Sequence, residues 1–189
     1  MFNLRKIAVF GLLLILFQQV LSQEVVTSSR IRVESGGSVP FNINSYKKYE
    51  EGMSFEYWTR LSLSFSDSIV TGTETNVSTA TWKLEFKANT ISMSGDYGGE
   101  LDLDLISIKL FDAGGNNELG EFIEEGGDEG YVSLSDAFQT LIKNAPQGNF
   151  NDNKILITYR IGQGEKKLLN NPPDYFTVDI IFELSKWAD

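Results

Sequence analysis

From residue 30 onward, apolar and polar side chains alternate one by one along most of this chain. A period of two is the repeat of a β-strand, whose successive side chains point to opposite faces. The clearest run is 176–184, in which Ile181 is the single apolar residue on the polar face. Its apolar face is formed by Phe176, Val178, Ile180, Phe182 and Leu184. Short alternating runs separated by turn residues favour a β-sandwich or barrel.

The alternation predicts strands at 30–34, 39–44, 59–65, 81–88, 91–93, 101–111, 155–159 and 176–184. Polar stretches predict a turn at 47–52 and loops at 67–80 and 114–130. The phase of the alternation changes at Leu105–Ile106, which indicates a bulge or a strand that passes from one sheet to the other.

One short helix is predicted at Ser135–Lys143, packed at an end or edge of the sandwich. Ser135 can cap its first turn, and Phe138, Leu141 and Ile142 recur at helical spacing. Pro146 follows as a stop signal. The predicted fold class is therefore all-β, an Ig-like or pilin-like β-sandwich with one short helix.

The first residues have the three-part order of a secretory signal peptide. Arg5 and Lys6 precede an apolar run at 7–17, and small or tolerated residues precede a cleavage position after Ser22. The apolar run is shorter than the ~20 residues that span a bilayer. We therefore expect residues 1–22 to be a cleaved signal and 23–189 to form a single β-sandwich domain. The protein would be exported and periplasmic, cell-surface or extracellular, without membrane insertion after cleavage.

The composition excludes several kinds of chemistry. The chain contains no histidine and no cysteine, so Ser-His-Asp and Cys-His catalysis and ordinary structural zinc sites are ruled out. A formal charge of −10 opposes binding to nucleic acid. Carboxylate pairs, Ser-Lys dyads and oxygen-ligand metal sites remain. We expect a protein that is not an enzyme and needs no cofactor, with calcium as the one candidate ion.

The N-terminal signal pattern and four further segments together resemble small exported β-sandwich proteins of Bacteroidetes-type bacteria, some of which are compared with fimbrial subunits. These segments are Trp82–Ala88, 134–136, 155–160 and Tyr175–Leu184. The resemblance implies an Ig-like or pilin-like sandwich and assigns no functional residue. Two features depart from chaperone–usher pilins: the segment 23–29 is short and polar for a donor strand, and the cysteine pair of such subunits is missing.

Acidic residues are concentrated between 112 and 129, in a stretch rich in glycine. Calcium takes six to eight oxygen ligands, which such a stretch can supply. The candidate ligands are Asp112, Glu118, Glu121 and Asp128. A solvated loop without an ion is the alternative. Asp102 and Asp104 could form a carboxylate pair for glycoside hydrolysis, although neighbouring acids on a strand also protect an edge from aggregation.

Aromatic side chains crowd the stretch 46–58 and recur near the C-terminus. Such side chains stack on sugar rings or form protein contacts, but they also close the ends of cores. The candidate binding residues are Tyr46, Tyr49, Tyr57, Trp58 and Trp187.

The leading functional hypothesis is a structural or adhesive protein, either a fimbria-like subunit or an accessory component of a surface assembly. It would join other protein subunits by strand pairing, with 176–184 donating or accepting the pairing. The alternative is a glycan-binding module that works with or without calcium. A carboxylate-only glycosidase is a third hypothesis.

Overall fold

Antiparallel strands make up most of the part of the chain that the computed structural model describes, residues 23–41, 43, 45–123, 130–163, 167–169, 171 and 174–188. The predicted signal peptide, 1–22, lies outside these residues. The chain divides into two compact units. In the ranges described, the first unit comprises 23–27 and 67–78, and the second comprises 28–66 and 79–188. None of the helices in these ranges is long and apolar enough to cross a membrane.

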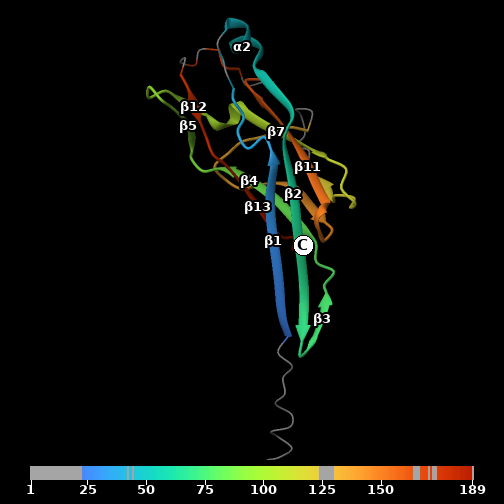
Figure 1. Cartoon of the computed structure of the whole chain (residues 1–189). Helices are drawn as coiled ribbons and strands as arrows, with labels where there is room; N and C mark the ends of the chain where they lie inside the picture. Colours follow the sequence, from blue (N-terminus) through green and yellow to red (C-terminus); the bar gives the residue numbers. More distant parts are fainter. Residues whose placement is uncertain are drawn as a thin grey trace, which may run out of the picture. The chain divides into compact units, whose positions relative to one another are not determined.

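The largest sheet has the strand order β1-β2-β11-β7-β9 (Figure 1). Its strands are β1 (Gln23–Ser35), β2 (Met53–Thr71), β11 (Gly148–Ile161), β7 (Ile106–Asp112) and β9 (Val132–Ser133). The central strand β11 pairs antiparallel with β2 on one side and with β7 on the other. In these pairings Ile157 of β11 lies opposite Thr59 in β2 and Leu110 in β7.

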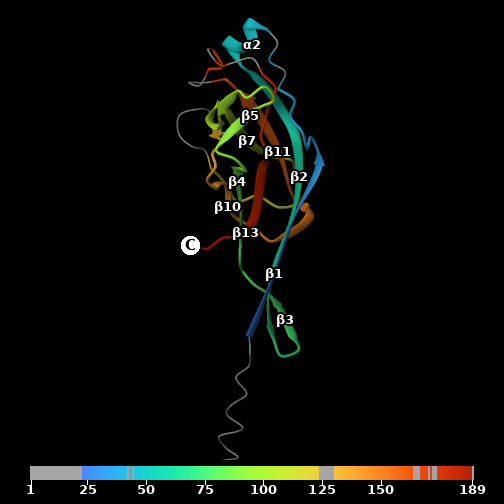
Figure 2. The same ribbon diagram turned by 90° about the vertical axis from the view of Figure 1, so that its left-hand side faces the viewer.

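Two smaller sheets complete the second unit (Figure 2). One has the order β13-β4-β10-β8, formed by Ile180–Lys186, Trp82–Ala88, Gln139–Ala145 and Glu121–Phe122. The other has the order β12-β5-β6, formed by Phe176–Thr177, Ser92–Gly95 and Glu100–Asp102.

Alternation of side chains builds the core between these sheets. The inward residues of β2, Leu61, Leu63 and Phe65, are fully buried. The inward residues of β4, Trp82, Leu84 and Phe86, are equally inaccessible and belong to the same cluster. Trp82 also satisfies its indole N–H, which donates to the carbonyl of Pro146 at 2.6 Å. The predicted all-β, sandwich-like fold with a single short helix in the described residues is confirmed.

The change of phase at Leu105–Ile106 is where the chain changes sheets. A 3-10 turn, η1 (Leu103–Leu105), separates β6 in the small sheet from β7 in the large one. Leu103 and Leu105 are buried within the turn, and Ile106 and Ile108 are buried in β7. Side chains of both parities therefore reach the core, because the backbone turns between the two sheets.

The predicted helix at Ser135–Lys143 is wrong. Residues Gln139–Ala145 form strand β10, which pairs with β4 on one side and β8 on the other. A register shift between Thr140 and Ile142 allows the adjacent Leu141 and Ile142 both to be buried, so the apolar spacing resembled that of a helix. Pairing on both edges outweighs the weak local helical preference.

The α-helix among the described residues is α2 (Tyr46–Glu51), where a polar turn was predicted. Ser45 caps it by accepting a hydrogen bond from the Lys48 N–H, and Gly52 ends it at a φ of 73°. The expected strand 39–44 is also wrong, since the described residues Val39–Phe41 and Ile43 are not in a strand. Asn42 and Asn44 lie outside the described residues.

The predicted loop 67–80 is wrong because it contains most of the first unit. Strand β2 continues to Thr71 and returns as β3 (Glu74–Val77), with a two-residue turn between them. Gly72 takes a φ of 64° in this turn, which glycine adopts without strain. The buried carboxylate of Asp67 accepts hydrogen bonds from the hydroxyls of Thr27 and Ser78, at 2.5 Å each.

Candidate functional site

Strand β13 lies at the edge of its sheet, with β4 as its hydrogen-bonded neighbour. The seven register pairs from Ile180↔Ala88 to Lys186↔Trp82 are unbroken. Leu184 is buried beneath the strand, whereas Ile181 is 40% exposed on its outer face. The prediction that Ile181 is the apolar exception on the outer face is confirmed. The predicted run 176–184 is, however, divided between β12 and β13, which belong to different sheets.

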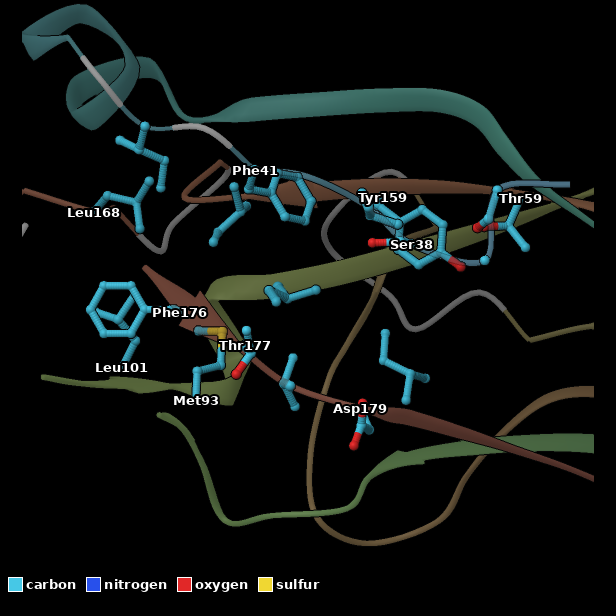
Figure 3. Close-up of a pocket in the computed structure, with 18 of the residues that line it drawn as sticks. Ser38, Phe41, Thr59, Met93, Leu101, Tyr159, Leu168, Phe176, Thr177 and Asp179 are labelled. Atoms are coloured by element: carbon cyan, nitrogen blue, oxygen red, sulfur yellow. The ribbon is translucent and has the colours of Figure 1, made fainter. Parts of the chain in front are cut away.

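A cavity of about 440 Å³ lies beside the beginning of β13 (Figure 3). Its apolar wall comes from all three sheets and includes Leu61, Met93, Leu101, Ile161, Phe176 and Phe182. The non-strand segment after β1 closes another side through Val39 and Phe41. Figure 3 shows Met93, Leu101 and Phe176 grouped at one end of the cavity, away from Tyr159 and Thr59.

Hydroxyl groups gather at the Tyr159 end of the cavity. Figure 3 shows Tyr159 beside Ser38 and Thr59. The Thr59 hydroxyl donates to the carbonyl of Gly36, and a side-chain hydrogen bond joins Thr59 to Tyr159. Burial raises the pKa of the Tyr159 phenol, although the bond to Thr59 acts in the opposite direction. The phenol is therefore neutral over the physiological pH range.

Two carboxylates are the charged groups among the described residues that line the cavity: Asp174 and Asp179. Asp174 accepts hydrogen bonds from the backbone N–H groups of Tyr97, Gly99 and Tyr175. Desolvation acts to raise the pKa of Asp174, but these backbone hydrogen bonds outweigh it and the pKa is lowered. Asp174 is consequently ionised at neutral pH.

The five predicted aromatic binding residues do not form one patch. Tyr49 points inward and lines the cavity, while Tyr46 is exposed on the same helix, α2. Trp187 follows β13, and its backbone N–H donates to the carbonyl of Thr81, just before β4. Figures 1 and 2 both place α2 and the C-terminus at opposite ends of the second unit.

Tyr57 and Trp58 lie in an irregular part of β2. Between the pairs Phe55↔Tyr159 and Thr59↔Ile157, β2 has more residues than β11, which is a bulge. Tyr57 adopts a φ of 51° there and remains 52% exposed, with its ring against Phe111 at a centroid distance of 4.8 Å.

Trp58 is held more firmly than its neighbour. Its indole N–H donates to the Ser38 carbonyl at 2.8 Å, and its ring packs edge-on against the Phe55 ring at a centroid distance of 4.9 Å. Trp58 therefore closes one margin of the sandwich, although 39% of its surface is exposed.

The predicted calcium ligands are only partly described. Asp112 accepts a hydrogen bond from the N–H of Gly114, and Glu121 forms an ion pair with Lys143 at 3.0 Å. Asp128 lies outside the described residues. Within those that are described, no group of three or more acidic side chains gathers as a metal site. The two candidate carboxylates for glycoside hydrolysis lie in different elements, Asp102 in β6 and Asp104 in η1.

The cavity was missed by sequence reasoning. Its apolar residues read as ordinary core positions, because alternation shows which face is buried and not whether the facing layers fill the space between them. Asp174 gave no signal either, since it follows Pro172–Pro173 at the end of a polar loop. No protein-family model matches the chain, and comparison with curated proteins finds no match.

Proposed function

We propose that this protein is an exported structural or adhesive subunit that joins other protein subunits by β-strand addition. Export is inferred from the signal-peptide pattern of residues 1–22. The observation that carries the proposal is the edge position of β13, which has β4 on one side and an apolar outer residue, Ile181. A strand at the edge of a sheet offers backbone N–H and carbonyl groups to an incoming strand.

The experiment measures the solution mass of residues 23–189 by light scattering over a range of protein concentrations. We expect the mass to rise with concentration in the wild-type chain. Ile181→Lys should abolish this rise, because an edge lysine opposes pairing with another strand. Ile91→Lys is the matched control, since Ile91 is 83% exposed and lies outside the strands.

A wild-type chain that stays monomeric at every concentration would contradict self-assembly. Equal association of Ile181→Lys and wild type would show that β13 is not the joining edge. Loss of association in the Ile91→Lys control would point to a general effect of added charge.

A glycan-binding role is the second candidate, favoured by the bulge that exposes Tyr57. A non-glycine residue at positive φ is strained, and such strain is often found at binding sites. An exposed tyrosine ring can stack on the apolar face of a sugar. Tyr57→Ala should then remove binding to a polysaccharide panel while the unfolding midpoint stays close to wild type. Trp58→Ala should instead lower the midpoint through lost packing.

A further inference from the structure

The cavity beside β13 is too large to be a packing defect. Protein interiors are close-packed, with few voids larger than a water molecule. An apolar cavity of roughly 150 Å³ already stays dry and binds benzene. The cavity here, at about 440 Å³, is well above that size and falls in the range of ~300–1,000 Å³ typical of small-molecule sites.

The side chains that line the cavity indicate the chemistry of most of the ligand. Leu61, Met93, Leu101 and Ile161 line the cavity and are themselves almost completely buried. Such side chains make dispersion contacts with aliphatic groups and offer no hydrogen bonds. Most of the ligand must therefore be apolar.

The charged residues define what the ligand cannot carry. Asp174 and Asp179 are the charged residues among the described lining residues, and both are acidic, although Asp179 is exposed and its carboxylate accepts a hydrogen bond from Asn89. An anionic group would be repelled by them and would also lose hydration on entering an apolar space. A free fatty acid is therefore disfavoured relative to an uncharged molecule of the same length.

The hydroxyl cluster defines one polar contact. Tyr159 shares one side-chain hydrogen bond with Thr59, whose hydroxyl also contacts the carbonyl of Gly36. The phenolic oxygen retains acceptor capacity, which a ligand hydroxyl group can use. Tyr159 is 4% exposed, so a hydrogen bond formed there would be shielded from water.

We propose that this cavity binds an uncharged aliphatic molecule bearing a hydroxyl group. The aliphatic part lies among the apolar side chains, and the hydroxyl donates to Tyr159. Long-chain alcohols and sterols share this chemistry. The site is separate from the outer face of β13 that carries Ile181, so this inference goes beyond the proposed role in assembly.

The test is equilibrium dialysis of the purified protein against radiolabelled 1-decanol, with decanoate as the anionic counterpart of equal length. We expect saturable binding of 1-decanol at one site per chain and at least about tenfold weaker binding of decanoate. Cholesterol in a parallel arm distinguishes a linear from a ring-shaped ligand.

Two variants fill the cavity from partly buried positions: Val178→Trp and Val39→Trp. Each should abolish 1-decanol binding while circular dichroism confirms the fold. Val77→Trp is the control, because Val77 is exposed in β3 and does not line the cavity. Tyr159→Phe should weaken 1-decanol binding by about threefold to tenfold, through loss of one hydrogen bond.

Several outcomes would overturn the proposal. These are absence of saturable binding to both 1-decanol and cholesterol, equal affinity for 1-decanol and decanoate, or undiminished binding in both folded tryptophan variants. Unchanged binding in Tyr159→Phe would overturn the hydroxyl contact. Loss of 1-decanol binding in Ile181→Lys, with normal binding in Ile91→Lys, would also contradict the proposal, because it would show that this site is not separate from the outer face of β13.

Discussion

At the scale of single residues, tight backbone contacts set the margins of the sandwich. Gly36 follows β1 and adopts a φ of 68°. A Cβ atom at this position would lie 2.2 Å from the carbonyl oxygen of Trp58, whose own indole N–H binds Ser38. The close approach of these two backbones requires glycine for space as well as for conformation.

Gly36→Ala should therefore destabilise the protein more than a glycine substitution that costs conformation alone. Gly98 is the matched control, because its φ is 87° and an added Cβ would meet nothing within 4 Å. We expect a loss of about 1 kcal/mol for Gly98→Ala and more than about 3 kcal/mol for Gly36→Ala. Urea unfolding measures both, and equal losses would show that the contact with Trp58 relaxes.

At the scale of elements, β13 combines a structural face with an accessible one. Leu184 contributes to the core, and Phe182 stacks on Phe86 at a centroid distance of 6.4 Å. Ile181 points outward from the same strand. The two faces can therefore be changed independently, which makes β13 suitable for separating folding from association.

Leu184→Ala should lower the free energy of unfolding by about 2–4 kcal/mol, since it removes buried methyl groups and leaves a cavity. Ile181→Ala should change it by less than about 1 kcal/mol. Denaturant titration of the two variants gives the comparison. A similar loss in both would mean that the outer face of β13 is covered in solution.

At the scale of the whole molecule, the two units differ in their burial. The described apolar core lies in the second unit. In the first unit, Val25, Val26 and Val77 are exposed, and every residue of β3 is accessible to solvent. Segments with little buried apolar surface open locally at lower free energy than a core does.

Hydrogen exchange should therefore be faster in β3 than in β4. We expect amides of 74–77 to exchange at least about tenfold faster than those of Trp82–Ala88 under native conditions. Mass spectrometry of peptides that cover each strand measures the rates. Equal protection of the two strands would show that the first unit is stabilised as strongly as the core.

Period-two alternation was sufficient to predict the all-β class, most core strands and the apolar side of the final run. The phase change at Leu105–Ile106 left a bulge or a passage between sheets open, and the structure shows the passage, through η1. These features are local, because each depends on which face of a strand is buried. The aromatic candidates were identified by type, but the sequence could not show that Tyr49 turns inward while Tyr57 stays exposed.

The tertiary structure decided what depends on partners distant in the chain. Residues 139–145 form a strand because β4 and β8 pair with them, although their apolar spacing favours a helix. The bulge at Tyr57 arises from its register with β11. The cavity is likewise set by the distance between layers that meet around Leu61 and Phe176. Alternation fixes which side chains face inward, whereas the space left between them depends on how all three sheets pack.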